Sequence, residues 1–257
     1  MNNSTPWKKL WFFDFDGTLS PIVSERSKAM IHRDCKKLLE ELVAKPFECV
    51  AVISSRLLDD LIPRVGVSGV FLGGGSGVEW YVEGKDRWTF SKKMEKRLQW
   101  VRAKAIPRIM EISKIPGIEI EDKKWSVAVH TRKGNTGAKR KVVLFVEDIC
   151  TALKLKTFKG PEVIELQLLP EIDKAFGVRA LCEYLRFRPV EGSLFYAGDD
   201  ENDATAMRWV LQRGGIALTV GHVPVAAGTG IVRDSEALVR EIRNLEGKNE
   251  RLKHVPV

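Results

Sequence analysis

The sequence Phe13-Asp14-Phe15-Asp16-Gly17-Thr18-Leu19 places two carboxylates and an Asp-Gly turn at the end of an apolar run that begins at Leu10. The bulky, uninterrupted hydrophobicity of this run is typical of a buried strand. The polar residues therefore fall at the carboxyl end of a strand, which is where open α/β sheets bind their ligands. This stretch predicts a parallel α/β fold with a site at the edge of its sheet.

Predicted strands alternate with predicted helices both before residue 82 and after Pro170, and this alternation supports the fold. In the first part, strands are expected over 10–15, 49–53 and 70–72, with helices over 28–44 and from 57. After Pro170, helices are expected over 175–184 and 203–211, and strands over 194–197 and 216–220. Strands and helices that alternate at such intervals indicate βαβ units and a parallel sheet.

The segment 82–166 differs from both flanks in pattern and in charge. It predicts a long lysine-rich helix over 90–111, strand-like alternation over 118–132, a helix over about 138–152 and a strand over 163–169. It holds 20 Lys and Arg against 11 Asp and Glu, and so carries the positive excess of a chain whose net charge is +8. We therefore predict a core formed by 1–81 and 167–257 and an inserted α+β cap domain over 82–166.

The composition, 44% hydrophobic and 30% charged over 257 residues, is that of a globular protein. The four cysteines are scattered and form no CxxC pair, which argues against a disulfide framework and a cysteine-rich zinc site. The first apolar run is cut off by Asp14, and the uncharged stretch 214–232 is broken by five glycines and Pro224. We expect a cytoplasmic protein with no membrane partner.

Further polar residues lie near the ends of other predicted elements: Ser54, Lys174, and Gly198-Asp199-Asp200 with Asp203. In a parallel sheet these groups converge with Asp14 and Asp16 at one edge. Several converging carboxylates repel one another unless a cation joins them, and a set of hard oxygen ligands favours Mg²⁺ over zinc. Mg²⁺ is therefore the expected cofactor.

Together these elements resemble, in order, the four motifs of the haloacid dehalogenase superfamily of aspartate-nucleophile phosphotransferases. The resemblance implies a Rossmann-like, haloacid dehalogenase-like core. It further implies that Asp14 is the nucleophile, Asp16 the general acid and base, and Ser54 and Lys174 the groups that hold the phosphate. Mg²⁺ would be bound by Asp14, Asp16 and Asp199. Support for the phosphate or its loop is expected from Gly17, Thr18, Ser55, Arg56, Asp200 and Asp203.

Four shorter stretches resemble the trehalose-6-phosphate phosphatases within that superfamily: residues 14–23, Ile53-Ser54-Ser55-Arg56, Gly77-Val78-Glu79, and Glu121-Asp122-Lys123. This resemblance implies hydrolysis of trehalose 6-phosphate through an aspartyl phosphate. Sugar hydroxyls would be held by Glu121, Lys123 and Glu165, because carboxylates accept several hydroxyl hydrogen bonds and a lysine donates them. The wider set of expected substrate-binding residues adds Ser76, Glu79, His130 and Arg132.

The sequence departs from that family's pattern at Ser76, where a histidine is usual, at Ser55, which replaces a glycine, and at Gln167, which replaces an arginine. These departures leave open a different sugar phosphate, such as a sucrose or mannosylglycerate phosphate. His130 alternates with two valines and is expected to face away from the apolar side. A non-catalytic protein that binds nucleic acid through its basic cap is a distant alternative. The intact catalytic set and the absence of an aromatic stacking pattern argue against that alternative, so we expect a sugar phosphate and no nucleic acid as partner.

Overall fold

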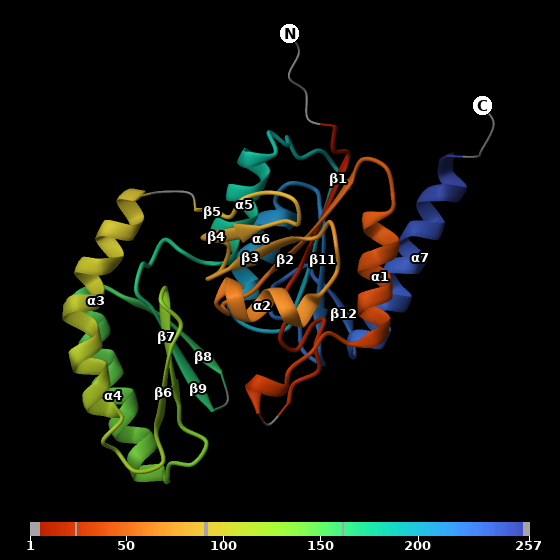
Figure 1. Cartoon of the computed structure of the whole chain (residues 1–257). Coiled ribbons are helices and arrows are strands. Elements are labelled where there is room, and N and C mark those ends of the chain that lie inside the picture. The colour runs from red at the N-terminus through yellow and green to blue at the C-terminus, as the bar shows by residue number, and fades with distance from the viewer. Residues whose placement is uncertain (1–5, 24, 90–91, 161, 254–257) are drawn as a thin grey trace.

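The computed structural model describes residues 6–23, 25–89, 92–160 and 162–253, and these form a core and a cap, each with its own sheet (Figure 1). The core sheet has eight strands. Their order is β12 (Gly230–Val232), β11 (Ile216–Val220), β10 (Leu194–Gly198), β1 (Lys9–Phe13), β2 (Glu48–Ile53), β3 (Phe71–Gly74), β4 (Glu79–Tyr81) and β5 (Trp88–Thr89). Neighbours from β12 to β3 are parallel, and the β3–β4–β5 edge is antiparallel.

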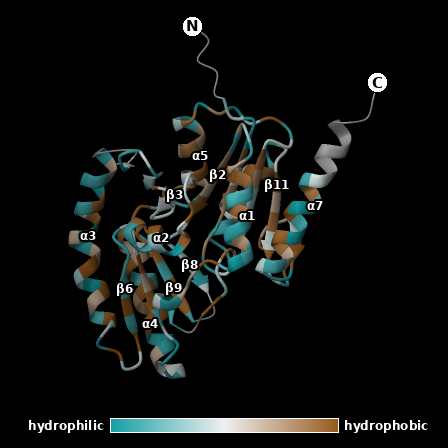
Figure 2. Cartoon of the chain, turned by 45° about the vertical axis from the view of Figure 1, so that its right-hand side comes forward, coloured by the Kyte–Doolittle hydropathy of each residue, from teal (hydrophilic) through white to brown (hydrophobic). Residues whose placement is uncertain are grey.

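Helices cover both faces of the core sheet, so β1 is buried on both sides. Trp11 and Phe13 pack with α1 (Arg33–Val43), α2 (Leu58–Val65) and α7 (Ser235–Lys253). Leu10 and Phe12 pack on the other face with α5 (Lys174–Tyr184) and α6 (Asp203–Leu211). Figure 2 shows apolar strands beside α1 and α7, whose outward faces are largely hydrophilic. Burial on both faces is why β1 reads as a continuous apolar run rather than an alternating one.

The order of the strands reverses between β1 and β10. From β1 the chain proceeds through β2 to β3 on one side, whereas β10, β11 and β12 follow one another on the other side. The register pairs Phe13 with Val52 on β2 and with Ala197 on β10, so the loops after these three strands meet at one edge. A reversal of this kind opens a crevice at the carboxyl ends of the strands, and this crevice holds the candidate site.

The cap consists of α3 (Lys92–Ile112), β6 (Glu119–Asp122), β7 (Ser126–His130), α4 (Thr136–Leu153), β8 (Lys156–Gly160) and β9 (Val163–Gln167). Its antiparallel sheet has the order β6-β7-β9-β8. Both helices pack on one face of that sheet, around buried residues such as Ile109, Val127 and Val146. Figure 1 shows the helices on the outer side of the cap and the sheet between them and the core. The polar face of the cap sheet is thereby turned toward the core.

The predicted α/β core with an α+β insert is confirmed, but the boundaries of the insert differ from 82–166. Trp88 and Thr89 form β5, which pairs with β4 and extends the core sheet, so the cap begins later, at α3. Gln167 is the last residue of β9 and pairs with Ser126, which places it in the cap. The helix expected over 28–44 begins only at Arg33, and a short 3-10 turn, η1 (Arg26–Lys28), precedes it.

Among the described residues, no helix combines the length and the apolar character that crossing a membrane requires.

Candidate active site

The centre of the site is a buried lysine held between two buried carboxylates. Lys174 Nζ donates to Asp14 Oδ1 at 2.5 Å and to Asp203 Oδ1 at 2.6 Å. Lys174 is the first residue of α5, and the side chain of Asp173 caps that helix by accepting from the Phe176 amide. Burial alone would lower the pKa of Lys174, but the charges of Asp14 and Asp203 raise it well above its usual value. The ammonium therefore stays charged inside the site.

Asp203 organises the turn that follows β10. Its Oδ1 accepts from Lys174 and, at 2.7 Å, from the hydroxyl of Tyr196. Its Oδ2 accepts from the backbone amides of Asp199 and Asp200 at 3.0 and 3.1 Å. These bonds fix the position of Asp199 relative to Lys174. The expectation that Asp203 supports the loop agrees with these contacts, whereas Tyr196 was missed because it lies in an apolar strand whose sequence gives no polar signal.

Three carboxylates come together beside the lysine. Single oxygens of Asp14, Asp199 and Asp203 all lie within 4.8 Å of one another. Burial, with the neighbouring charges of Asp203 and Asp200, raises the pKa of Asp199 to about 8. Burial likewise raises the pKa of Asp14 well above its usual value, although Lys174 opposes this. A hard divalent cation such as Mg²⁺ relieves repulsion of this kind, and since both oxygens of Asp203 already accept hydrogen bonds, Asp14 and Asp199 are the residues that fit it.

Gly17 allows the loop after β1 to approach this cluster. Its φ of +81° lies in the left-handed region, and a Cβ at this position would overlap the Asp199 carboxylate. Thr18 was expected to support the loop by hydrogen bonding. The buried Thr18 hydroxyl has no partner among the described residues, and instead the Thr18 carbonyl accepts from Ser235 Oγ at 2.7 Å. Within the described part of the chain, the hydrogen bond that Thr18 makes to another element is therefore that of its backbone carbonyl, which the first residue of α7 reaches.

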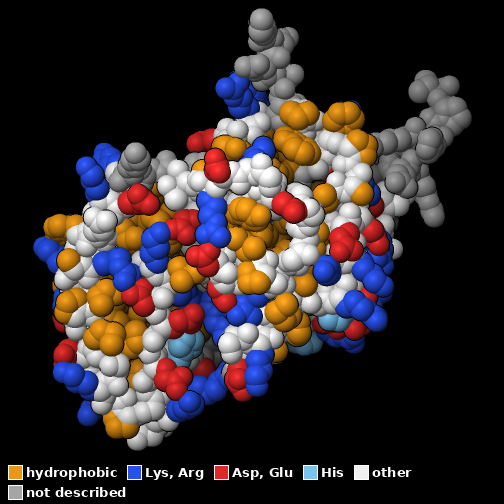
Figure 3. Space-filling view, in the orientation of Figure 1, with side chains coloured by type: hydrophobic (Ala, Val, Ile, Leu, Met, Phe, Trp, Pro, Cys, Tyr) orange, Lys and Arg blue, Asp and Glu red, His pale blue; other side chains and the backbone are white. Residues whose placement is uncertain are grey.

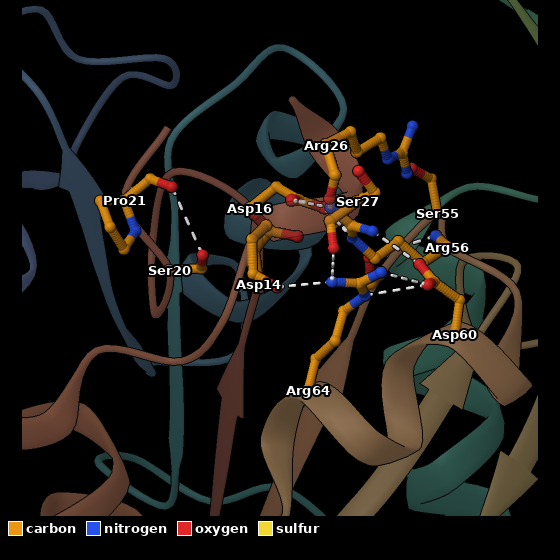
Figure 4. Close-up of polar contacts among 12 residues, drawn as sticks. Asp14, Asp16, Ser20, Pro21, Arg26, Ser27, Ser55, Arg56, Asp60 and Arg64 are labelled. Atoms are coloured by element: carbon orange, nitrogen blue, oxygen red, sulfur yellow. Dashed lines mark hydrogen bonds and ion pairs between the residues drawn. The ribbon is translucent and has the colours of Figure 1, made fainter. Parts of the chain in front are cut away.

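Asp16, the expected general acid and base, is held by a buried arginine. Arg56 Nε and Nη2 donate to the two oxygens of Asp16, both at 2.7 Å. The same guanidinium donates to Asp60 at 2.6 Å and to the carbonyl of Arg26 at 3.0 Å. Figure 4 shows Arg26, Arg56 and Arg64 gathered around Asp16 and Asp60. Both Asp16 oxygens are occupied by Arg56, so the structure gives no support to coordination of a cation by this side chain.

The loops after β2 and β3 carry the expected serines. Ser54 is buried directly after β2, and its Oγ accepts from the amide of Arg56 at 3.2 Å. Ser76 is also buried, has a φ of +60°, and donates its amide to the Ser54 carbonyl at 2.8 Å. Ser55 Oγ lies 3.3 Å from Lys123 Nζ, which comes from the cap. The loop after β2 therefore contacts the cap through Ser55.

One group of polar side chains lies on the core-facing side of the cap sheet. Lys123 Nζ donates to Glu165 Oε2 at 2.8 Å, and Ser126 Oγ donates to Glu165 Oε1 at 2.7 Å. Gln167 follows Glu165 on the same face of β9 and is buried, and its Nε2 has no partner among the described residues. The structure therefore brings together Lys123 and Glu165, two of the residues predicted to hold sugar hydroxyls, and places the unusual glutamine two residues after Glu165 on the same strand.

A second group is centred on Glu121. Arg26 Nη1, from the core, donates to Glu121 Oε2 at 2.9 Å, and His130 Nε2 lies 3.0 Å from the same oxygen. Burial would raise the pKa of Glu121, but the hydrogen bond from His130 and the charges of Arg26 and Lys123 lower it to about 2. Glu121 is therefore ionised across the neutral pH range. Arg26 was not predicted, since nothing in the local sequence links this loop residue to the cap.

A cavity of about 390 Å³ lies between the core and this part of the cap. Residues 119–123 and His130 line it on the cap side, and Arg26, Arg56 and Arg64 are among the residues on the core side. Figure 3 shows charged side chains of both signs around a histidine on this part of the cap. Glu79 and Arg132 were expected to bind substrate but do not line this cavity. Arg132 is exposed, and Glu79 accepts from Trp125 Nε1 at 3.3 Å and pairs with Lys124, which ties the cap to the core sheet.

The family model described as trehalose-phosphatase matches residues 12–233. The chain belongs to this family. It is 36% identical over 208 residues to the trehalose-phosphate phosphatase of Mycobacterium avium, covering 79% of this chain and 51% of that protein. It is 31% identical over 217 residues to that of Mycobacterium tuberculosis, covering 82% of this chain and 53% of that protein. The chain spans about half the length of the curated relatives it matches.

Solved structures of trehalose-phosphatase relatives share the fold. A trehalose-6-phosphate phosphatase related protein aligns over 95% of this chain and 99% of its own, with a TM-score of 0.72 at 20% identity. The C-terminal domain of the Candida albicans trehalose-6-phosphate phosphatase aligns over 96% and 99%, with a TM-score of 0.71 at 18% identity. A Synechocystis sucrose-phosphatase, solved with sucrose and phosphate, aligns over 93% and 98% with a TM-score of 0.62 at 13% identity. The predicted family and fold class are confirmed.

Proposed function

We propose that the protein is a Mg²⁺-dependent phosphatase that hydrolyses trehalose 6-phosphate. The observation that carries the proposal is the buried Asp14–Lys174–Asp203 group at the carboxyl end of β1, in a chain of the trehalose-phosphatase family. A buried ammonium next to a carboxylate directly after a strand is suited to hold a phosphate against a nucleophile. The acidic cluster beside it fits Mg²⁺, and Asp14 and Asp199 would hold the ion.

In this proposal Asp14 attacks the phosphorus in line, the bond from phosphorus to the sugar oxygen breaks, and an aspartyl phosphate forms. Bound Mg²⁺ would supply positive charge that offsets the repulsion between the carboxylate and the phosphate. Lys174 and Ser54 hold phosphate oxygens. Asp16 gives a proton to the leaving sugar oxygen and later takes one from the water that releases phosphate. For each transfer, one Asp16 oxygen must leave its hydrogen bond from Arg56. Arg56 restricts the rotation of Asp16 through its two hydrogen bonds, so the carboxylate keeps one direction relative to Asp14.

The cap would select the sugar. Lys123 contacts Ser55 of the core, and Glu121 lines the cavity, so the cap's polar side chains lie next to the phosphate-holding loop. Carboxylates and an ammonium in this position match the alternating donors and acceptors of sugar hydroxyls. A second candidate is a phosphatase for another sugar phosphate. Gln167 supports it, because this residue differs from the family pattern and its buried Nε2 donates to no described residue, so it is able to donate to a different substrate.

The test is phosphate release from trehalose 6-phosphate, sucrose 6-phosphate, a mannosylglycerate phosphate, glucose 6-phosphate and p-nitrophenyl phosphate, each with Mg²⁺ and with EDTA. We expect the highest kcat/KM for trehalose 6-phosphate, and loss of activity in EDTA that Mg²⁺ restores. Preference for another sugar phosphate would replace the substrate assignment. Full activity of metal-free protein would contradict the Mg²⁺ requirement. Filter binding of RNA and DNA at moderate salt tests the nucleic-acid alternative in the same preparation.

A further inference from the structure

The η1 turn is a part of the core that reaches across to the cap. It follows the loop that carries Asp14 and Asp16, and its first residue, Arg26, donates from Nη1 to Glu121 Oε2 at 2.9 Å. The two residues are 95 positions apart in the sequence. Both line the cavity between the cap and the core, and their side chains are 29% and 37% exposed. The pair is therefore accessible to a ligand that enters the cavity.

Two arginines hold the backbone of this turn in place from the core side. Arg56 Nη2 donates to the Arg26 carbonyl at 3.0 Å, and Arg64 Nη1 donates to the carbonyls of Ser27 and Ala29 at 2.8 and 2.7 Å. Both guanidinium groups are in turn bonded to Asp60 (Figure 4). The Arg26 side chain thus extends from a fixed base, and Arg56 links that base directly to Asp16.

Glu121 lines the cavity and has one oxygen to which no described residue donates. Arg26 and His130 both meet Oε2, and among the described residues no hydrogen bond to Oε1 occurs. A carboxylate held by one oxygen has a defined direction for the other, which suits it to accept a hydroxyl hydrogen bond. The guanidinium also offsets the negative charge of Glu121, which would otherwise repel an incoming phosphate ester.

We propose that Arg26 is a positioning residue for substrate specificity: through its ion pair with Glu121 it fixes this cap carboxylate over the cavity so that Oε1 accepts a hydroxyl of the sugar phosphate. The inference rests on the proposed function insofar as the substrate carries a sugar. It adds a residue of the core to a specificity site whose other residues come from the cap. Arg56 links this residue to Asp16, because it donates to the Arg26 carbonyl and to the Asp16 carboxylate.

The experiment compares Arg26→Ala and Arg26→Lys with Lys28→Ala, a matched control in the same turn whose ammonium pairs with the exposed Glu25. The substrates are p-nitrophenyl phosphate and whichever sugar phosphate the wild type hydrolyses fastest. Arg26→Ala should raise KM for the sugar phosphate roughly threefold to tenfold with little change in kcat, since a partly exposed pair is lost. Arg26→Lys should recover part of this, and Lys28→Ala should change neither substrate.

A double-mutant cycle shows whether Arg26 acts through Glu121. In the Glu121→Gln background, Arg26→Ala should have no further effect on KM. Hydrogen–deuterium exchange without substrate provides an independent readout, and we expect faster exchange at residues 119–122 in Arg26→Ala but not in Lys28→Ala.

Three results would overturn the proposal. Equal losses on both substrates would mean that Arg26 maintains the turn beneath Asp16. An unchanged KM would mean that the pair has no part in binding, and an effect that persists in Glu121→Gln would mean that Arg26 does not act through Glu121. A wild type that prefers a sugar phosphate other than trehalose 6-phosphate would overturn the substrate assignment and leave this test intact.

Discussion

Two groups of ion pairs, one inside the core and one that joins the core to the cap, differ mainly in burial. In the core, the Lys174, Asp14 and Asp203 side chains are at most 5% exposed. In the second group, called the cap group because it is centred on Glu121, the side chains of Arg26 from the core and of His130 and Glu121 from the cap are 29%, 34% and 37% exposed. A buried charge has no substitute partner when its own is removed, whereas a partly exposed one can turn to water or to a ligand. The core group is therefore suited to hold reacting atoms, and the cap group to exchange its contacts with a substrate.

The sharpest test of the core group is Asp14→Asn. The amide oxygen can still accept from Lys174, which also keeps Asp203, so the fold should persist while the nucleophile is lost. We expect phosphate release to fall roughly a thousandfold or more, with an unchanged circular dichroism spectrum. Residual activity within tenfold of the wild type would exclude Asp14 as the nucleophile.

The second test compares how much Asp203→Ala and Glu121→Ala each lower the free energy of unfolding. Loss of Asp203 takes from Tyr196 and two backbone amides the acceptor they share, and leaves Lys174 with Asp14 alone. We expect the free energy of unfolding to be lower by roughly 3–5 kcal/mol in Asp203→Ala, and by about 1 kcal/mol or less in Glu121→Ala. Urea denaturation of both variants gives the values. Equal losses would show that burial does not separate the two groups.

Glu165→Gln tests whether the polar side chains of the cap contribute to substrate specificity. The amide keeps the size of the side chain but gives up one strong acceptor for sugar hydroxyls. We expect kcat/KM for trehalose 6-phosphate to fall about 10- to 100-fold, while hydrolysis of p-nitrophenyl phosphate, which has no hydroxyls to hold, stays within twofold. Glu162→Gln is the matched control, because Glu162 is a more exposed cap carboxylate that pairs with Lys139. A parallel loss on both substrates would assign Glu165 to the fold of the cap.

The smallest expected effect is a dependence of stability on pH in the metal-free protein. Asp199 has a pKa of about 8 in the fold and about 3.9 when unfolded, so between these values the folded state binds the extra proton. Stability should therefore fall as pH rises from about 4 to 8. Differential scanning fluorimetry in EDTA should show a Tm about 2–5 °C lower at pH 8 than at pH 5.5, relative to Asp199→Asn. Mg²⁺ should reduce the difference in Tm between pH 5.5 and pH 8. If the Tm of the wild type changed with pH in the same way as that of Asp199→Asn, Asp199 would not be the source of this pH dependence.

The sequence predicts the core group better than the cap group, and the reason is local. Asp14, Ser54 and Asp199 each follow an apolar strand directly, so their meeting follows from the parallel sheet. The pair of Arg26 with Glu121 joins two surface segments that no periodic pattern connects. Tyr196 gives no sign of its hydrogen bond because it sits in a buried strand. Strand β8, Lys-Thr-Phe-Lys-Gly, was missed because an exposed edge strand lacks apolar alternation.

The long distance along the chain between the partners of the buried lysine has a consequence for biosynthesis. Asp14 and Lys174 are 160 residues apart, and the whole cap is made between them. β1 likewise acquires its neighbour β10 only after the cap is complete. A nascent or truncated chain that ends with β10, at Gly198, has neither Asp199 nor Asp203, so its site is incomplete. Since contacts so distant in sequence form slowly, the reactive centre is expected to assemble late, and its formation requires the chain from β1 to the start of α6.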